Sequence, residues 1–455
     1  MADNFNLREE LARCVKCGAC MAVCPIYRQT GREELVARGK LALVERRQRE
    51  KEEPAAGNLS AFYRQAIDHC LLCHACEDNC SKNVQITAII KESRREITAA
   101  RGLHPVKKAL FGLLRGRFGG LRTLTRIGSW LQLLAWKRLP AGSGLRRRLP
   151  LPLIDDQTVI PAIPRRNLDD RLRRRPAAAA ADRPAVFFYP GCTARYLTPE
   201  LGVQTVAVLE KLGYRVVVPR EWTCCGAVVE AAGDRQTAVE LQQRNLRVLA
   251  AAADRGPATV VTVCATCGHT LKGYPLPAGC QVMDISEFLY AHRQPLEKLL
   301  AGKTLDRRLT YHDPCHLRRG QKITAEPRWL LRLLAGDNFV ELRHPERCCG
   351  SGGSFGVTHK ALSRQILGEK IADLRQSAAA VIASGCPGCL IQLNEGIQME
   401  KLAVAAVHPV TLLAELLAAP PAGETAAAVP TSGEEKKTPA KSRRAEKTSH
   451  KRKKG

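Results

Sequence analysis

The chain has 455 residues, of which 45% are hydrophobic and 25% charged, and its formal net charge is +27. This length is sufficient for two or three domains with packed cores. Nineteen cysteines without a secretory leader argue against a secreted disulfide scaffold, so we expect a cytoplasmic chain whose reduced thiolates bind metal. The absence of an apolar run of roughly 18–20 residues argues against a segment that spans a bilayer.

Residues 1–100 contain eight cysteines in two runs, and helical patterns are expected over residues 33–49 and 84–101. Both runs read C-x2-C-x2-C-x3-C, which lets a loop wrap three corners of a cubane cluster. In bacterial two-cluster ferredoxins the fourth cysteine of each run ligates the other cluster. The predicted ligand sets of two [4Fe–4S] clusters are therefore Cys14, Cys17, Cys20 and Cys80, and Cys24, Cys70, Cys73 and Cys76.

Two zinc sites are the alternative interpretation of these runs. Zinc takes four ligands, commonly as two separated Cys-x-x-Cys pairs. It gives no reason for a third and fourth cysteine to recur at the same offsets. We therefore prefer iron and sulfide, and paired clusters indicate that electrons pass through the chain.

Residues 101–183 contain no cysteine, and from 101 to 175 there are 18 Lys or Arg against four Asp or Glu. Apolar residues recur here at helical spacing; Val106, Ala109, Leu110, Leu113 and Leu114, for example, share one predicted face. Several glycines argue against one continuous helix. The composition is typical of a helix that contacts a membrane surface or a partner subunit. Packing against the protein's own domains remains the open alternative.

Residues 184–418 form an internal repeat. Short apolar runs over residues 185–189, 259–263, 308–312 and 380–384 lead into cysteines like buried strands, and helical patterns over 203–212 and 235–251 lie between them. This order predicts α/β halves with mainly parallel sheets, whose strand-end loops gather on one side. The further candidate cluster ligands are Cys192, Cys224, Cys225, Cys264 and Cys267, and Cys315, Cys348, Cys349, Cys386 and Cys389.

Each half has a lone cysteine, then Cys-Cys-Gly, then Cys-x-x-Cys, and this pattern resembles the cysteine-rich (CCG) domain. Tandem copies occur in heterodisulfide reductase subunits and in the iron–sulfur subunits of glycolate and lactate oxidases. The segments 311–317, 348–353 and 387–392 resemble the glycolate oxidase subunit in particular. Both five-cysteine sets are complete, which is more similar to the heterodisulfide reductase branch. The resemblance implies one or two additional non-cubane [4Fe–4S] clusters in these domains.

The resemblance implies an electron-transfer subunit of a multisubunit FAD-linked oxidoreductase that oxidises glycolate or D-lactate. FAD is expected on a partner subunit only, because the chain has no G-x-G-x-x-G between a strand and a helix. A membrane quinone or a b-type cytochrome would accept the electrons, with peripheral contact at the inner face of the cytoplasmic membrane. The alternatives are a thiol–disulfide reductase of the heterodisulfide reductase type and a basic binding module with structural clusters. No nucleic-acid partner is expected.

The predicted fold is therefore an α+β/α/β multidomain chain. A helical bis-[4Fe–4S] ferredoxin domain (1–100) and a basic amphipathic linker (101–183) precede two tandem α/β CCG domains (184–300 and 301–418). Residues 419–455 are expected to be a disordered basic tail. His269, His312 and His316 are expected to be hydrogen-bonding neighbours of the cysteines and not cluster ligands.

Overall fold

The computed structural model describes residues 5–51, 59–115, 119–138, 145–147, 159–175 and 182–418. The range Met1–Ala419 forms one compact unit, and all the elements below belong to it. The predicted basic tail, residues 419–455, lies outside the described residues. Within the described ranges, no helix combines the length and the apolar character needed to cross a membrane.

The first hundred residues are helical, as predicted, and pack around their own small core. Val44, Ile67, Ile89 and Ile90 are fully buried there. The helix expected over residues 33–49 is divided in two, because the backbone is extended at Val36. The elements are α1 (Leu7–Ala12), α2 (Ala19–Val23), α3 (Pro25–Thr30), η1 (Glu33–Leu35), α4 (Ala37–Glu50), α5 (Ala61–Asp68), α6 (Ala75–Asp78) and α7 (Ile86–Arg101).

The basic segment forms two separate helices, α8 (Pro105–Arg115) and α9 (Gly119–Ala135). Only the C-terminal half of α8 is covered, by α14, so Leu114 is buried while Val106 and Leu110 are exposed. The apolar face predicted for this helix is therefore only partly used inside the protein. Three short strands that the sequence did not indicate pair antiparallel after α9, and a short helix follows them: β1 (Trp136–Arg138), β2 (Leu145–Arg147), β3 (Val159–Ile160) and α10 (Leu168–Leu172).

The first cysteine-rich half is built on a parallel four-stranded sheet in the order β5-β4-β6-β7. The predicted strands over 185–189 and 259–263 are confirmed to within one residue. The strands are β4 (Ala185–Tyr189), β5 (Arg215–Val217), β6 (Ala258–Thr262) and β7 (Cys280–Asp284). The helices are α11 (Gly191–Tyr196), α12 (Pro199–Lys211), α13 (Ala227–Ala231), α14 (Arg235–Ala253), α15 (Ala265–Lys272), α16 (Ile285–Ala291) and α17 (Arg293–Leu299).

The second half repeats this plan with a parallel three-stranded sheet in the order β10-β9-β8. Its strands are β8 (Leu309–Tyr311), β9 (Val381–Ala383) and β10 (Ala405–Val407). Its helical elements are α18 (Cys315–Arg318), α19 (Ala325–Ala335), η3 (Gly336–Asn338), α20 (Phe355–Thr358), α21 (Lys360–Ser377), α22 (Pro387–Met399) and α23 (Pro409–Ala418).

The two halves share one hydrophobic core. Helix α23 of the second half packs on α12 of the first, where Leu209 and Leu413 are both fully buried. The Thr411 hydroxyl donates to the Gln204 side chain at 2.8 Å across the same contact. Apolar burial on this scale holds the halves in one relative orientation, so the cysteine loops of both halves face each other.

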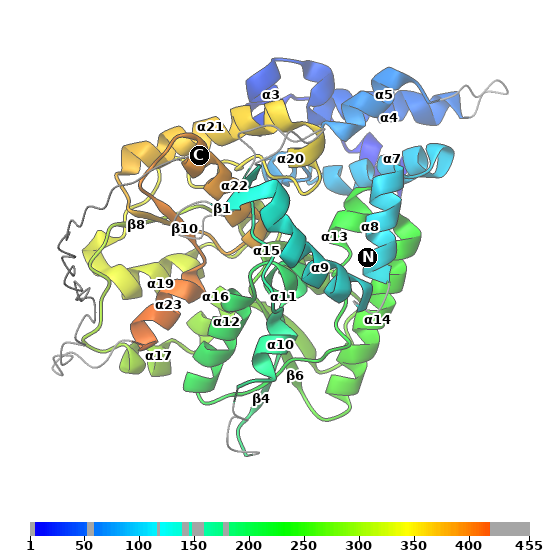
Figure 1. Ribbon diagram of the computed structural model, residues 1–455. Helices are drawn as coiled ribbons and strands as arrows, with labels where there is room; N and C mark the ends of the chain where they lie inside the picture. The colour runs from blue at the N-terminus through cyan, green and yellow to red at the C-terminus, as the bar shows by residue number, and fades with distance from the viewer. Residues whose placement is uncertain are drawn as a thin grey trace, which may run out of the picture. The chain divides into compact units, whose positions relative to one another are not determined.

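The N-terminal helices lie across both halves, with α3 beside α21 and α7 beside α13 (Figure 1). The Arg94 guanidinium of α7 donates to the Ala231 carbonyl at 2.9 Å. On the other side, the Gln29 amide donates to the Glu369 carboxylate at 2.5 Å. These contacts bring the ferredoxin-type loops to the strand-end side of the repeat.

Candidate metal centres

The first ferredoxin-type set surrounds a small cavity of about 30 Å³. Two of its cysteines lie on the loop before α2 and the third is in the first turn of α2; Lys16 and Gly18 of this loop have left-handed backbone conformations (φ 57° and 82°). The Asn79 amide donates to the Ala19 carbonyl at 2.8 Å, which brings in the end of the second run. The cysteines that line this cavity are Cys14, Cys17, Cys20 and Cys80.

The second set lines another cavity of about 30 Å³. Leu72 and His74 adopt left-handed conformations (φ 52° and 59°), which are costly for residues other than glycine and are typical of functional loops. The structure thus gathers the same two groups of four as the crossed assignment from the sequence. The cysteines here are Cys24, Cys70, Cys73 and Cys76.

The thiol chemistry of these cavities fits a metal cluster. Burial raises the pKa of Cys73 to about 12, and the neighbouring Cys348 adds to this effect. Burial likewise raises the pKa of Cys20 and of Cys24. Ligand thiolates are therefore unfavourable here unless a cationic group balances their charge, which iron ions supply. Four cysteines in each cavity match the ligand number of a [4Fe–4S] cluster.

Lys40 is a candidate functional residue that the sequence did not indicate. Its side chain is only 3% exposed, lines the second cavity and donates to the His69 carbonyl at 3.2 Å. Its charge lowers the pKa of Cys24, against the larger effect of burial. Nothing in the pattern of α4 distinguishes this lysine from the exposed basic residues around it.

All ten cysteines of the repeat line one cavity of about 210 Å³. Each half presents its cysteines on loops that follow its strands. Cys264 and Cys386 occupy the same place in the repeat, as the N-cap residues of α15 and α22. The partial positive charge of a helix N-terminus favours thiolates at these positions.

The glycine after each cysteine pair has a definite role. The Gly226 and Gly350 amides each donate to the sulfur of the first cysteine of the pair, Cys224 and Cys348, at 3.4 Å. Both glycines are left-handed, and a Cβ on Gly350 would lie 2.5 Å from the Ser363 carbonyl oxygen. The Cys-Cys-Gly sequence is therefore a turn that holds an amide against a sulfur, as in cluster-binding loops.

The two five-cysteine sets meet inside the cavity. The pKa of Cys264 is raised well above its usual value. Its hydrogen bond with Cys267 lowers the pKa, but its hydrogen bond with Cys386 and its burial raise the pKa by more. The pKa of Cys386 is lowered, chiefly by the hydrogen bond with Cys264 and then by that with Cys389. Cys264 and Cys386 belong to different halves, so the thiols of the two sets are direct neighbours.

The cavity also borders the ferredoxin-type loops. The pKa of Cys315 is raised by its hydrogen bond with Cys348 and by burial, and Cys73 contributes to the same increase. Cys73 and Cys348 also line a common cavity of about 80 Å³ beside Arg319. The second ferredoxin-type set is therefore next to the second cysteine-rich set.

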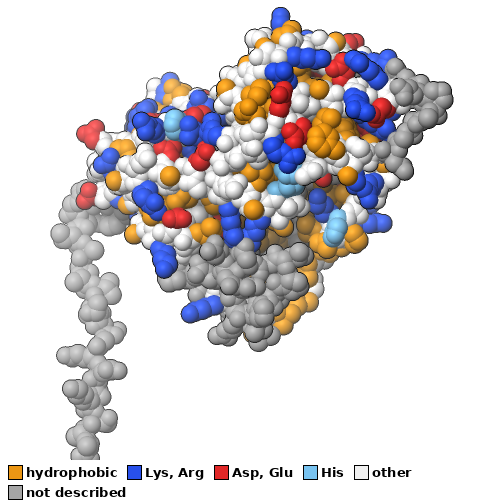
Figure 2. All heavy atoms as spheres, turned by 90° about the horizontal axis from the view of Figure 1, so that it is seen from above, with side chains coloured by type: hydrophobic (Ala, Val, Ile, Leu, Met, Phe, Trp, Pro, Cys, Tyr) orange, Lys and Arg blue, Asp and Glu red, His pale blue; other side chains and the backbone are white. Residues whose placement is uncertain are grey.

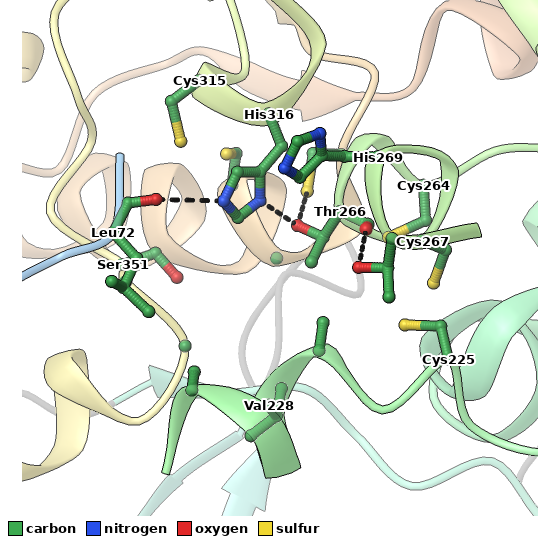
Figure 3. Close-up of a pocket in the computed structure, with 18 of the residues that line it drawn as sticks. Leu72, Cys225, Val228, Cys264, Thr266, Cys267, His269, Cys315, His316 and Ser351 are labelled. Carbon is green, nitrogen blue, oxygen red and sulfur yellow. Dashed lines mark hydrogen bonds between the residues drawn. The ribbon is translucent and has the colours of Figure 1, made fainter. Parts of the chain in front are cut away.

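Two histidines lie between the cysteine sets, with Cys225, Cys264 and Cys267 on one side and Cys315 on the other (Figure 3). One His316 ring nitrogen pairs with the Leu72 carbonyl oxygen at 3.1 Å and the other with the Thr266 hydroxyl at 2.9 Å. Burial lowers the pKa of His316 to about 4 and that of His269 to about 3. Both rings are therefore neutral hydrogen-bonding neighbours at physiological pH.

His312 differs from these two. One of its ring nitrogens lies within 4.8 Å of the thiols of Cys349 and Cys389, which is close enough for all three to hold one metal ion. Its Nδ1 is buried without a partner among the described residues. The geometry thus makes His312 a candidate metal ligand. The sequence alone favoured a hydrogen-bonding neighbour of the cysteines at this position.

Comparisons with known proteins agree with this arrangement. Residues 10–84 match the 4Fe-4S dicluster domain, and residues 186–272 and 309–394 match the cysteine-rich domain. The chain is 29% identical over 430 residues to a probable glycolate oxidase iron–sulfur subunit of Bacillus subtilis, covering 89% of this chain and 94% of the relative.

Two further relatives represent both expected branches. The glycolate oxidase iron–sulfur subunit of Escherichia coli is 28% identical, with coverage of 85% of this chain and 89% of the relative. A dihydromethanophenazine:CoB–CoM heterodisulfide reductase subunit of Methanosarcina acetivorans is 27% identical, with coverage of 90% and 94%. The chain therefore contains a 4Fe-4S dicluster domain followed by two cysteine-rich domains, and it is similar to iron–sulfur subunits of both the glycolate oxidase and the heterodisulfide reductase type.

Proposed function

We propose that this protein is the iron–sulfur electron-transfer subunit of a multisubunit FAD-linked oxidoreductase of the glycolate or D-lactate type. A flavin subunit would oxidise the 2-hydroxy acid, and a membrane quinone or b-type cytochrome would receive the electrons. The observation that carries the proposal is the unbroken succession of cysteine sites within one compact unit. It leads from the first ferredoxin-type cavity through the second to the cavity of the repeat.

The proposed ligands follow from this succession. The eight ferredoxin-type cysteines bind two [4Fe–4S] clusters in the crossed sets, and the ten cysteines of the repeat bind one or two further clusters. These groups supply one-electron chemistry when bound. The protein holds them close together and keeps bulk water away, because Cys73, Cys264 and Cys386 are buried. Lys40 adds a fixed positive charge beside the second set, which favours electron uptake there.

Cys73 lies close to Cys315 and Cys348, so the second ferredoxin-type set adjoins the second cysteine-rich set on the proposed electron route. With clusters bound, electrons would pass between the second ferredoxin-type set and the second cysteine-rich half, and the contact of Cys264 with Cys386 would link that half to the first. His316 joins the loop of Leu72 to Thr266 along the same line. Its neutral ring lets it maintain these contacts without adding charge.

Iron and acid-labile sulfide analysis of anaerobically purified protein tests the cluster content. About eight irons per chain are expected if only the ferredoxin-type sets are filled, and about twelve to sixteen if the repeat also binds clusters. Co-expression with the flavin subunit should give glycolate- or D-lactate-dependent reduction of a quinone analogue that requires this chain. Full activity of the flavin subunit with quinone in its absence would contradict the proposal.

A thiol–disulfide reductase is the second candidate function. Its support is the meeting of two complete five-cysteine sets at one cavity of about 210 Å³. The purified chain with all clusters present should then reduce a low-molecular-weight disulfide when supplied with a reduced dye. A lack of turnover under those conditions would leave electron transfer as the function.

A further inference from the structure

Helices α8 and α9 each expose large apolar side chains. Their exposed fractions range from 46% for Leu110 to 69% for Val106. Exposed single apolar residues are ordinary on protein surfaces, whereas a gathered set marks an interaction site. We call this set the α8–α9 surface; it consists of Val106, Leu110, Leu124, Ile127, Trp130 and Leu131.

Helix α9 is inverted relative to the usual amphipathic helix. Its polar residues Ser129 and Gln132 are 3% and 8% exposed, while Trp130 and Leu131 are 68% and 54% exposed. The Gln132 amide donates to the Ile163 carbonyl at 2.9 Å, and its oxygen accepts from the Ile163 amide at 2.8 Å. These paired hydrogen bonds fix the rotation of the helix. Trp130 and Leu131 therefore face outward.

The segment that carries this surface is strongly basic, and Arg115 at the end of α8 pairs with Glu240 of α14. Between residues 101 and 154 there are twelve Lys or Arg and no Asp or Glu. Lys108 and Arg126 are exposed on α8 and α9, and the Arg165 guanidinium lies 4.7 Å from the centre of the Trp130 ring. By contrast, the face seen in Figure 2 mixes basic and acidic side chains. The local field of the α8–α9 surface therefore attracts anions.

We propose that the α8–α9 surface binds the surface of a membrane that contains anionic lipid. Trp and aliphatic side chains enter the boundary between headgroups and acyl chains, while Lys and Arg contact the acidic headgroups. A membrane contact would place the protein where its proposed acceptor lies, although the inference rests on the surface alone.

The test uses the full-length protein and sedimentation with sucrose-loaded vesicles. Phosphatidylcholine vesicles with about one third phosphatidylglycerol should retain the wild type, and pure phosphatidylcholine vesicles should retain much less. The variant Leu124→Ser/Ile127→Ser/Trp130→Ser should bind the anionic vesicles at least about tenfold more weakly, because it loses three apolar contacts. Lys108→Glu/Arg126→Glu should weaken binding most at low salt.

Two control variants test whether a loss of vesicle binding is specific to the α8–α9 surface. Leu299→Ser changes a 40% exposed leucine on α17, and Arg255→Glu reverses an exposed charge after α14. Both should bind like the wild type. The basic tail is identical in all variants, so its attraction to anionic vesicles cancels in the comparison. Circular dichroism and iron content should match the wild type in every variant.

Four outcomes would overturn the inference. They are no binding by the wild type, equal binding to both vesicle types, unchanged binding by the triple variant, or equal losses in the controls. A dimer of the wild type that the triple variant abolishes, without vesicle binding, would show that the surface contacts protein instead. None of these measurements depends on electron transfer, so this inference and the proposed function can fail separately.

Discussion

The crossed ligand sets can be tested by substituting cysteines that are far apart in sequence. Cys20 and Cys80 line the first ferredoxin-type cavity, whereas Cys24, only four residues after Cys20, lines the second. Cys20→Ala and Cys80→Ala should therefore remove the same cluster, and Cys24→Ala should remove the other. Each change takes one of four thiols from one cavity, so the iron content should fall by up to about four per chain.

Low-temperature EPR of the reduced protein distinguishes the clusters. The spectra that remain in Cys20→Ala and Cys80→Ala should superimpose and should differ from that of Cys24→Ala. Cys280→Ala is the matched control, because Cys280 lies on β7, lines none of the cysteine cavities described above and donates to the Leu249 carbonyl at 3.4 Å. If Cys20→Ala instead gave the spectrum of Cys24→Ala, each run would bind its own cluster and the crossed assignment would be wrong.

Three further changes test other parts of the structure. Lys40→Met should lower the reduction potential of the second ferredoxin-type cluster, because it removes a buried positive charge, and an EPR-monitored redox titration that found no decrease would contradict this role. A Cβ on Gly352 would lie 2.4 Å from the Leu71 side chain, whereas a Cβ on Gly353, which is also left-handed, would meet nothing within 4 Å. Gly352→Ala should therefore lower the apparent unfolding temperature more than Gly353→Ala. Equal decreases in the two variants would argue against this contact. Burial raises the pKa of Asp284 to about 7, so the folded protein loses stability as the pH rises between about 4 and 7. Asp284→Asn keeps a good helix cap and should be more stable than the wild type, by an amount that grows toward about 4 kcal/mol above pH 7 and is measured by unfolding at several pH values.

Much of the fold was predictable because its determinants are local. The strand expected over residues 185–189 is β4 without change, and the run over 308–312 contains β8. Both are short runs of aliphatic, aromatic or β-branched residues, which suit a buried parallel strand. The antiparallel strands after α9 were not predictable, because β1 and β2 are rich in Lys and Arg and carry no alternating apolar pattern.

The apolar spacing of α9 predicts a helix but does not predict which way its apolar face points. Its apolar spacing predicts a face to be buried, and the same spacing suits the protein core, a partner or a membrane. In the structure, the hydrogen bonds between Gln132 and Ile163 hold the polar side of α9 inward, and Trp130 faces outward. Those residues are 31 positions apart and carry no motif.

The sequence by itself indicated a 4Fe-4S dicluster domain and two cysteine-rich domains through repeated cysteine patterns. Those patterns are short enough for the spacing along one loop to set the ligand geometry. The tertiary structure alone decided that ten cysteines face one cavity, that Cys264 meets Cys386, and that Cys73 lies next to Cys348. These contacts depend on how α12 and α23 bury their apolar faces together. Many apolar helices could pack in that way, so no sequence pattern specifies which pair does.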